Sequence, residues 1–549
     1  MLALSVVVWA YDRQGNLQAC LDRLAGQSGD SGGFEIILVT AGNPAIDPAR
    51  LSSSAPLRLV QAHGSDLGEA WNRGADAAAG NVLLFIRDDF TAAPHLVAAH
   101  RGVHLERSDI IGLGKVQPVP GATGLSACLV EQLQESTGDP AAGNRGVSVL
   151  ECAGHTLSLR RDTFQAAGPF LTGLAWGTEV EMAFRLVQRR KILLRLPEPV
   201  GQSHRPTNDR EIVSAAREAG ASAVKLYHRR PDLLPHLQLG AFQRGTPTGL
   251  WLRRLLLAMG GPGLPSGLVR RLLPRGTPTV RWNRFLLSYQ YWRGVREAVT
   301  DRAMWKSLTR APVILMYHSV AAAAEPAGCY LVPLRQFKRQ MAWLRFARYR
   351  VLGFEELLDC RREHRLPPGR SVVLSFDDGY ADNRQLAFPV LREHGFSAIF
   401  FLVTACIGGR NIWDQSGELA GRSLLSWVDL REMLSAGMQV GAHTRHHTAL
   451  PGVPLEEADR EIAGSRADLE RELGRRIRAF AYPYGLLDAT TPGAVARAGF
   501  EGACCSRSGF NDAVVSSYLL RRIEVRGTDS LLHFIRALGR GHAGRRRSQ

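Results

Sequence analysis

Two clusters of polar residues toward the carboxyl end of the chain have the types and spacing of a catalytic metal site. Ser375-Phe-Asp-Asp-Gly379 follows an apolar run and places the carboxylates of Asp377 and Asp378 in succession. His443-Thr-Arg-His-His447 follows another apolar run, 65 positions after Asp378. Residues four apart meet on one side of a helical turn, so the first and last of these histidines can share a cation. Two imidazoles and one carboxylate leave positions open for water and substrate, which suits zinc or a similar divalent ion.

Each motif also has an ordinary structural explanation. An Asp-Asp-Gly sequence is more often a turn, and paired histidines are often solvated or part of a core. The combination favours a site, because both motifs follow predicted strands and Phe480-Ala-Tyr-Pro-Tyr-Gly485 follows them in the chain.

The elements that would position these motifs alternate between strand and helix. Residues 1–228 and the chain beyond residue 311 show the same alternation, which favours parallel sheets covered by helices, so we expect an α/β protein. The predicted strands are Leu4–Val8, Glu35–Val39, Val82–Ile86, Val313–Met316, Val372–Ser375, Ala398–Val403, Gln439–Gly441 and Ala479–Tyr482.

Most of the excess positive charge lies between the two α/β regions. The net charge is +17, and residues 229–310 contain 15 Lys or Arg against 3 Asp or Glu. Arginine pairs flanked by apolar residues are typical of helices that lie on an anionic membrane, where each Lys or Arg contributes about 1 kcal/mol to membrane binding. Two examples are Trp251-Leu-Arg-Arg-Leu-Leu-Leu257 and Leu268-Val-Arg-Arg-Leu-Leu273. The alternative is a set of helices packed on the first domain with their arginines in solvent. We find no zinc-finger or RNA-binding motif and expect no nucleic-acid partner.

Neither secretion nor a membrane span is predicted. The apolar residues 1–10 have no basic segment before them and are better explained as a buried strand than as a signal peptide. The longest uncharged stretches are shorter than the roughly 20 apolar residues of a spanning helix. The eight cysteines, of which Cys504 and Cys505 are adjacent and the others scattered, include no CxxC motif and indicate a reducing compartment. We expect a cytoplasmic protein, and contact with the inner face of the membrane is one of the two interpretations of its basic region.

Residues 311–530 resemble the polysaccharide deacetylases, the NodB-homology group of carbohydrate esterase family 4. Ser375–Gly379 matches their first motif and His443–His447 their second. Met316-Tyr-His318 and Tyr482-Pro-Tyr-Gly485 are similar to sequences found in the branch of this family that acts on exported N-acetylglucosamine polymers. The resemblance implies a distorted (β/α) barrel with its site at the carboxyl ends of the strands.

The same resemblance implies roles for individual residues. It assigns Asp378, His443 and His447 to the metal and Asp377 to the general base. Tyr484, with Pro483 beside it, would bind substrate by lining the acetyl pocket and offering a backbone N–H to the oxyanion.

Two features depart from the family pattern. Ala481 stands where relatives often carry an arginine that orients the base, and the late Leu-x-His motif of the general acid has no clear match in Leu519-Leu-Arg-Arg-Ile-Glu-Val525. His318 is our candidate for a substitute acid or a pocket-lining residue, and a structural role is the alternative.

Six segments of the first α/β region match a known family in order: Ser5–Arg13, Glu35–Val39, Leu67–Gly74, Val82–Asp89, Leu157–Arg161 and Trp176–Arg185. On these segments, residues 4–228 resemble the family 2 glycosyltransferases of GT-A fold, which have a Rossmann-like sheet. Such enzymes need carboxylates for a cation, Mg²⁺ or Mn²⁺, at the diphosphate of a nucleotide-sugar, and a base for the acceptor hydroxyl.

The resemblance places Asp89 at the second carboxylate of the cation motif and Glu179 at the catalytic base. Arg87 replaces the first carboxylate, and Thr40-Ala41 replaces an aspartate after the second strand. One interpretation has Asp88 and Asp89 share the cation, with Arg87 directed toward the diphosphate. The alternative is a domain that has lost nucleotide binding and serves as a scaffold or glycan-recognition module.

These patterns predict a bifunctional glycan-assembly enzyme. Its parts would be a GT-A domain at residues 1–228, a basic helical linker at 229–310, a deacetylase barrel at 311–538 and a basic tail at 539–549. It would deacetylate an N-acetylhexosamine glycan, lipid-linked if it works at a membrane, and transfer a sugar from a nucleotide-sugar. The competing hypotheses are an active deacetylase carried by a non-catalytic, glycan-binding domain, and a chain in which neither domain is active.

Overall fold

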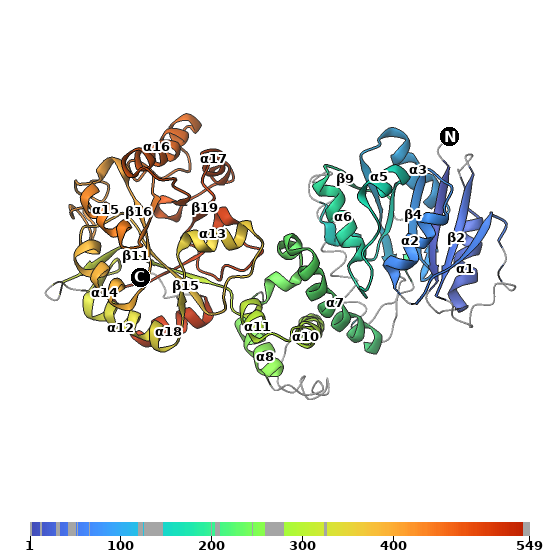
Figure 1. Cartoon of the computed structure of the whole chain (residues 1–549), viewed down its shortest axis with the longest axis horizontal. Coiled ribbons are helices and arrows are strands. Elements are labelled where there is room, and N and C mark those ends of the chain that lie inside the picture. Colours follow the sequence, from blue (N-terminus) through green and yellow to red (C-terminus); the bar gives the residue numbers. More distant parts are fainter. Residues whose placement is uncertain are drawn as a thin grey trace. The chain divides into compact units, whose positions relative to one another are not determined.

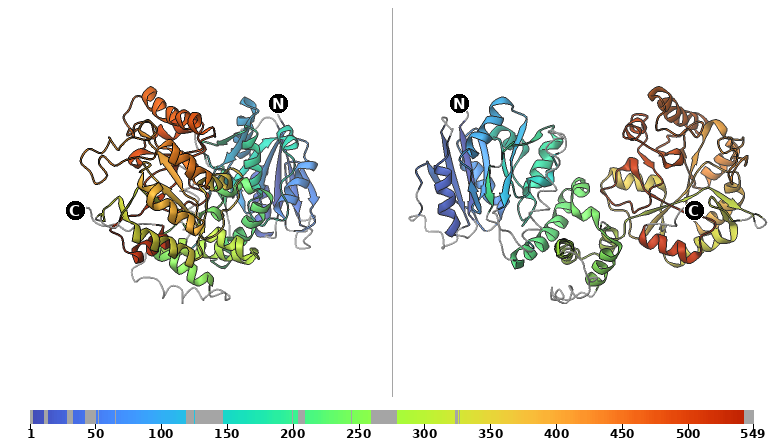
Figure 2. Two further views of the ribbon diagram at one scale, coloured as in Figure 1. Left: turned by 60° about the vertical axis from the view of Figure 1, so that its left-hand side comes forward. Right: turned by 180° about the vertical axis from the view of Figure 1, so that it is seen from behind.

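Two compact units make up the chain (Figures 1 and 2). The first contains Met1–Leu239 and Trp251–Val299, and the second contains Gly240–Leu250 and Thr300–Gln549. The computed structural model describes residues 3–10, 14–28, 33–41, 51, 53–64, 66–118, 125, 147–198, 200–203, 209–243, 245–258, 279–322, 325 and 327–541.

A seven-stranded sheet forms the centre of the N-terminal unit. Its strands in spatial order are β3 (Leu57–Gln61), β2 (Phe34–Thr40), β1 (Leu4–Ala10), β4 (Val82–Arg87), β8 (Thr156–Arg160), β6 (Ile110–Gly114) and β9 (Ile192–Arg195). The first four are parallel, and β8 runs antiparallel to both of its neighbours. Every side chain of β1 is buried, as its sequence, apolar except for Ser5, predicts for a central strand.

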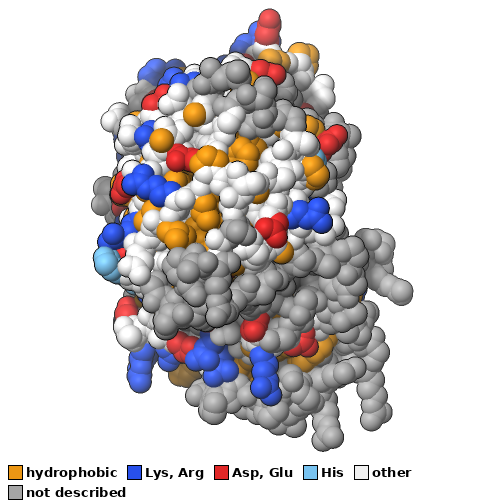
Figure 3. Space-filling model, turned by 90° about the vertical axis from the view of Figure 1, so that its right-hand side faces the viewer, with side chains coloured by type: hydrophobic (Ala, Val, Ile, Leu, Met, Phe, Trp, Pro, Cys, Tyr) orange, Lys and Arg blue, Asp and Glu red, His pale blue; other side chains and the backbone are white. Residues whose placement is uncertain are grey.

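Helices and a second, small sheet complete this unit. The small sheet pairs β5 (Phe90–Ala92), β10 (Gly201–Ser203) and β7 (Val116–Pro118). The helices are α1 (Gln14–Ala25), α2 (Leu67–Ala77), α3 (Leu96–Glu106), α5 (Arg161–Ala167) and α6 (Thr178–Gln188). The face of this unit on the side of β2 and α1 carries hydrophobic side chains among charged ones (Figure 3). Leu59 of the edge strand β3 is 43% exposed.

The basic region is helical where it is described. It contains α8 (Pro247–Ala258), α10 (Thr279–Ala298) and α11 (Arg302–Thr309), and α7 (Asp209–Arg229) comes directly before it in the chain. Helices α7 and α10 approach each other at two glycines: a Cβ on Gly220 would lie 1.9 Å from the Tyr291 carbonyl oxygen, and one on Gly294 would lie 1.8 Å from that of Arg217. The arginine pair within Leu268–Leu273 lies outside the described residues, as does most of the basic tail.

A nearly closed parallel sheet forms the centre of the C-terminal unit. Its strands in order are β19 (Gly502–Cys504), β18 (Ala479–Ala481), β17 (Gln439–Ala442), β16 (Ile399–Leu402), β15 (Ser371–Phe376), β11 (Val313–Tyr317) and β20 (Arg522–Glu524), and β14 (Arg350–Val351) pairs with β15. A parallel bridge between Cys504 and Leu520 links the two ends of this order. The sheet therefore closes into a distorted barrel.

The remaining elements of this unit surround the barrel. They are β12 (Ser319–Ala321) paired with β13 (Leu331–Pro333), and α12 (Leu334–Phe346), α13 (Phe354–Arg362), α14 (Phe388–His394), α15 (Trp427–Ser435), α16 (Leu455–Leu473), α17 (Thr491–Arg497) and α18 (Leu531–Arg540).

The barrel strands are buried on both faces, and alternation along each strand separates two cores. In β15, Leu374 and Phe376 pack with the surrounding helices, whereas Val373 packs in the barrel interior with Phe401 of β16. Because side chains alternate, residue 377 continues the interior row of β15, and residues 318 and 443 continue the interior rows of β11 and β17. The barrel thus directs polar residues from three strand ends into one interior mouth.

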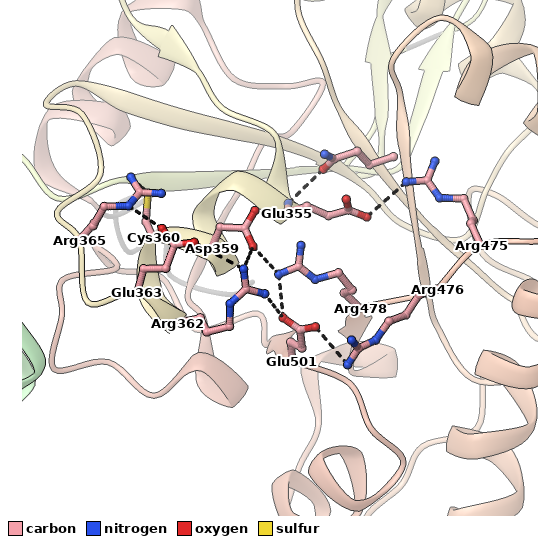
Figure 4. Close-up of polar contacts among 11 residues, drawn as sticks. Glu355, Asp359, Cys360, Arg362, Glu363, Arg365, Arg475, Arg476, Arg478 and Glu501 are labelled. Atoms are coloured by element: carbon pink, nitrogen blue, oxygen red, sulfur yellow. Dashed lines mark hydrogen bonds and ion pairs between the residues drawn. The ribbon is translucent and has the colours of Figure 1, made fainter.

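An ion-pair network lies at the amino ends of β18 and β19 (Figure 4). Arg478, just before β18, pairs at 2.7 Å with both Asp359 of α13 and Glu501, which precedes β19. Arg362 and Arg476 join the same carboxylates from the surface. These contacts are at the opposite ends of the strands from the interior mouth, where barrel residues stabilise the fold rather than act on substrate.

The expected fold class is confirmed: a Rossmann-like sheet in the N-terminal unit and a distorted barrel in the C-terminal unit. Each strand predicted from the sequence is a strand in the structure. None of the described helices combines the length and apolar character needed to cross a membrane. The described cysteines form no disulfide.

Candidate functional site

The carboxyl ends of β15 and β17 bring Asp378, His443 and His447 together. One ligand atom of each lies within 4.8 Å of the others, and all three side chains are buried. The Nε2 atoms of His443 and His447 lie 3.4 and 3.3 Å from the same oxygen, Asp378 Oδ1. The three residues chosen from the sequence as metal ligands therefore form one cluster.

Hydrogen bonds on the far sides of these groups orient them toward each other. The Nδ1 of His443 lies 2.7 Å from the Ala481 carbonyl oxygen, so Nδ1 carries the proton and Nε2 is left to bind a ligand. The Tyr380 hydroxyl donates to Asp378 Oδ2 at 3.0 Å and accepts from Asn411 Nδ2 at 2.9 Å. Among the described residues, buried Asp378 Oδ1 has no hydrogen-bond partner. An unsatisfied carboxylate oxygen between two imidazole nitrogens fits a divalent cation.

Burial and the neighbouring charges shift the pKa values of this cluster in opposite directions. Burial raises the pKa of Asp378, but the two histidines outweigh it and hold that pKa well below its usual range. Burial lowers the pKa of His443, but Asp378 and Asp377 raise it above its ordinary value. For His447 burial dominates, and its pKa is lowered.

The loop that carries the histidines is not helical, so the expectation of a helical turn is wrong. Residues 443–448 form a bend in which Thr444 and His447 have φ of +62° and +61°. Left-handed backbone at these two positions turns the chain back, and the two imidazole centroids lie 4.9 Å apart. The backbone of Asp378 is also left-handed, with φ of +70°. The alternation of side chains along β15 therefore ends after Asp377.

Asp377 is buried against an arginine from the last barrel strand. Arg522 Nη1 donates to Asp377 Oδ1 at 2.6 Å, and neither side chain is appreciably exposed. Arg522 Nε also donates to the Cys505 carbonyl oxygen, and its guanidinium lies over the Phe401 ring. Burial raises the pKa of Asp377, but Arg522, His443 and His318 outweigh it, so the carboxyl pKa is lowered.

Arg522 is a residue that the sequence analysis missed. The motif position expected to carry a base-orienting arginine holds Ala481, and Arg522 comes instead from β20, the next-but-one strand after β18 in the chain. Its sequence signal is its position two residues after Leu520: Leu520 packs in the barrel interior, so alternation directs the Arg522 side chain to the same side.

His318 follows β11 and continues the interior row of that strand, and its charge lowers the pKa values of Asp377 and Asp378. Its ring meets Tyr330 edge-on at 4.7 Å. Asn383 Nδ2 donates to the His318 carbonyl oxygen at 2.9 Å and fixes the backbone there. His318 is thus partly buried at the mouth of the barrel, close to the predicted base.

Two aromatic side chains enclose His447. Trp413 stacks on the imidazole at 4.8 Å, and Tyr484 meets it edge-on at 4.5 Å. Tyr484 is left-handed and 56% exposed, whereas Pro483 before it is buried. Trp413 was not predicted, because it lies in a loop with no recognisable motif. Asn411 connects that loop to Tyr380 and hence to Asp378.

The N-terminal unit places Asp88 and Asp89 in the turn between β4 and β5, with Asp88 buried. Arg87 lies over the Trp9 ring, with its Nε 3.7 Å from Asp89 Oδ1. The guanidinium therefore faces a carboxylate that was expected to hold a cation. Glu179 is buried in the first turn of α6.

Comparison with known proteins finds a family match within each unit. The polysaccharide deacetylase family matches residues 364–503, and glycosyl transferase family 2 matches residues 5–114. The chain joins a glycosyl transferase family 2 domain to a polysaccharide deacetylase domain. It is an enzyme, and its deacetylase domain contains the Asp378, His443 and His447 cluster.

Individual relatives resemble the deacetylase domain. Bacillus subtilis YxkH, named as a polysaccharide deacetylase, is 27% identical over 234 residues, which cover 42% of this chain and 78% of the relative. The poly-beta-1,6-N-acetyl-D-glucosamine N-deacetylase of Staphylococcus epidermidis is 29% identical over 179 residues, covering 31% of this chain and 59% of that enzyme. The solved structure of IcaB from Ammonifex degensii is 27% identical, with a TM-score of 0.37, covering 42% of this chain and 97% of that one.

Replacement of Arg522 tests how the Asp377 carboxyl is held. In Arg522→Met the burial that raises the Asp377 pKa is no longer opposed by the guanidinium, so that pKa rises. The carboxylate is then protonated at higher pH, and the acid limb of kcat/KM for acetate release should move to higher pH. Loss of one partner of a buried pair should also cost about 3–5 kcal/mol of unfolding free energy. Arg507→Met, which does not contact Asp377, is the control. An unchanged acid limb in Arg522→Met would show that Arg522 does not set this pKa.

Proposed function

We propose that the deacetylase domain hydrolyses the N-acetyl group of a hexosamine within a glycan, using a divalent cation held by Asp378, His443 and His447. The observation that carries this proposal is the unsatisfied Asp378 Oδ1 beside two imidazole Nε2 atoms. Zinc is the best candidate, because a set of two histidines and one carboxylate suits it. The name of the Staphylococcus epidermidis relative supports a poly-N-acetylglucosamine type of substrate.

The side chains around the cluster support a hydrolytic reaction. When bound, the cation would supply Lewis acidity toward the acetyl carbonyl and a lowered pKa for water. Asp377, kept ionised by Arg522, accepts a proton from the attacking water. The Tyr484 backbone N–H donates to the developing oxyanion, and Trp413 and Tyr484 enclose the acetyl group.

Completion of the reaction requires a proton on the leaving nitrogen. The new C–O bond forms as the water loses its proton, and the C–N bond then breaks to give acetate and a free amine. His318 is our proposal for the acid that protonates that nitrogen, because it continues the interior row of β11 at the mouth of the barrel, where its charge acts on Asp377 and Asp378. It would replace the histidine of the family's missing late motif.

Two substitutions separate cation binding from proton transfer. His443→Ala should lose the bound metal after dialysis, because one of three ligands is gone. Asp377→Asn should keep the metal but lose acetate release from chito-oligosaccharides by about 10²–10⁴-fold, because an amide cannot accept the proton. Metal content and acetate release are measured on the same samples. Equal activity in the wild type and both variants would disprove the mechanism, and His364→Ala, outside the site, is the control.

We also propose that the transferase domain uses a nucleotide-sugar. The chain would then be a bifunctional glycan-assembly enzyme. Its two domains, at residues 1–228 and 311–538, would be joined by the basic helices. In this interpretation Asp88 and Asp89 hold Mg²⁺ or Mn²⁺ at the diphosphate, and Glu179 is the base. Arg87 would then leave Asp89 and pair with the diphosphate when the donor binds.

Donor turnover distinguishes this proposal from a non-catalytic, glycan-binding domain. The full chain with Mg²⁺ or Mn²⁺ should hydrolyse or transfer a UDP-sugar, and Asp88→Asn should abolish that turnover while leaving acetate release unchanged. Asp76→Asn, on α2, is a matched control that should retain donor turnover. Release of acetate without turnover of any nucleotide-sugar tested would support the non-catalytic alternative instead.

A peripheral membrane contact would bring both domains to lipid-linked glycans, and we propose it for the basic helices. In α8, Trp251 is 63% exposed and Leu255, one turn later, is 38% exposed, with Arg254 beside them. An exposed apolar pair beside an arginine fits an anionic lipid surface, whereas Arg253 of the same motif is buried and donates to Ser288.

Vesicle binding tests that contact. The chain should sediment with phosphatidylglycerol vesicles but not with neutral phosphatidylcholine vesicles, and Trp251→Ser should weaken the binding. Phe346→Ser removes an exposed aromatic residue from the deacetylase domain and should leave binding unchanged. Equal binding by the Trp251→Ser and wild-type proteins would exclude α8 as the contact.

A further inference from the structure

Helix α16 holds the loop that carries both histidines. Glu461 accepts the backbone N–H groups of Arg445 and His446 on one oxygen, at 2.9 and 3.0 Å. Its other oxygen lies 2.6 Å from His446 Nδ1. One buried carboxylate thus makes three contacts with the residues between His443 and His447.

A second contact lies two turns further along the same face of α16. Asp468 Oδ2 accepts from Arg445 Nε and from Thr404 Oγ1, each at 2.9 Å. The Arg445 side chain passes over Gly464, where a Cβ would lie 2.6 Å from Arg445 Cδ. Positions 461, 464 and 468 share one face of a helix, so α16 contacts the loop along that face.

The loop needs this support because its backbone is strained. Thr444 and His447 are both left-handed without being glycine, a conformation that persists only where surrounding contacts impose it. Two successive N–H groups directed at one carboxylate are such a contact, and a charged acceptor makes these hydrogen bonds stronger than neutral ones.

His447 depends on the loop more than His443 does. The Nδ1 of His443 is fixed by the Ala481 carbonyl, whereas the buried Nδ1 of His447 has no hydrogen-bond partner among the described residues. The orientation of the His447 ring is therefore determined by its backbone and by the rings of Trp413 and Tyr484.

We propose that Glu461 is a positioning residue for the cation, which it serves by holding residues 444–447 in the conformation that presents His447 Nε2. This inference rests on the cation site of the proposed function. Glu461 contacts neither the three ligand side chains nor the predicted base, so its effect is on the affinity for the cation and not on the chemical step.

The test is a zinc titration of the full-length chain after chelator treatment, with the dissociation constant measured by competition with a chromogenic chelator. Glu461→Ala should raise that constant by about 10- to 100-fold, the usual range for residues that support metal ligands. Glu461→Gln, which keeps an acceptor for the N–H groups, should raise it less. At saturating zinc, kcat for acetate release by both variants should return to the wild-type value.

Glu470 provides a matched control on the same helix. It accepts from Arg466 Nε at 2.8 Å and from the Ile477 N–H at 2.9 Å, so its loss removes comparable hydrogen bonds without affecting the histidine loop. Glu470→Ala should keep the wild-type zinc affinity even if its thermal stability falls as far as that of Glu461→Ala. Equal zinc affinities for the two alanine variants would overturn the proposal.

The remaining outcomes are also decisive. If Glu461→Ala does not fold, Glu461→Gln is compared with Glu470→Gln, and equal affinities overturn the proposal. A wild-type chain that takes up no zinc overturns the cation site and this inference with it. A wild-type chain that binds zinc but releases no acetate overturns the proposed reaction alone, and the difference in affinity between the variants still decides the role of Glu461.

Discussion

Two adjacent carboxylates are buried at one point of the deacetylase barrel, and the other groups of the site compensate their negative charge. A buried ionised carboxylate is costly unless it is paired and hydrogen-bonded. Asp377 is paired with Arg522, and Asp378 is surrounded by His443, His447 and the Tyr380 hydroxyl. The two carboxylates have different partners because their backbones differ. Residue 377 continues the alternating pattern of β15, whereas the left-handed backbone at residue 378 breaks that pattern and points its side chain in another direction. Asp377 is therefore held in one orientation by an ion pair, whereas Asp378 keeps one oxygen that has no hydrogen-bond partner among the described residues.

The barrel makes this arrangement possible because parallel strands end at the same edge. Asp377, His318 and His443 each continue the interior row of a different strand, so their side chains converge although the chain between them is long. The barrel interior also leaves little space where the strands converge. A Cβ on Gly441 of β17 would lie 2.5 Å from the Phe401 ring, so a larger residue at that position would collide with the ring. In the transferase domain the predicted cation residues are local, Asp88 and Asp89 in one turn, and Arg87 beside them already neutralises part of their charge.

The strands and the three proposed cation ligands could be predicted from the sequence, because alternating apolar runs and a compact motif are local signals. The positions of partners from distant strands could not. Arg522 replaces an arginine expected 41 residues earlier, at Ala481. Its two-residue spacing from Leu520 is a local signal for an inward side chain, but it does not indicate which carboxylate that side chain meets. Asn411 and Trp413 lie in a loop without regular structure and reach the site only through Tyr380 and His447. The helical turn predicted for the histidines was wrong, because contacts with α16 stabilise a left-handed bend that local propensity disfavours.

The sequence by itself determined which residue types were available and which elements carry them: two carboxylates after one strand, two histidines after another, and a basic region between two α/β domains. Only the tertiary structure decided how those groups are used. Closure of the sheet brings β20 beside β11, which places a guanidinium against Asp377, and packing of α16 places a carboxylate beneath the histidine loop. The physical reason is that hydrogen bonds and ion pairs act over a few ångströms in space. Residue separation along the chain carries no information about such distances once strands of a barrel have paired.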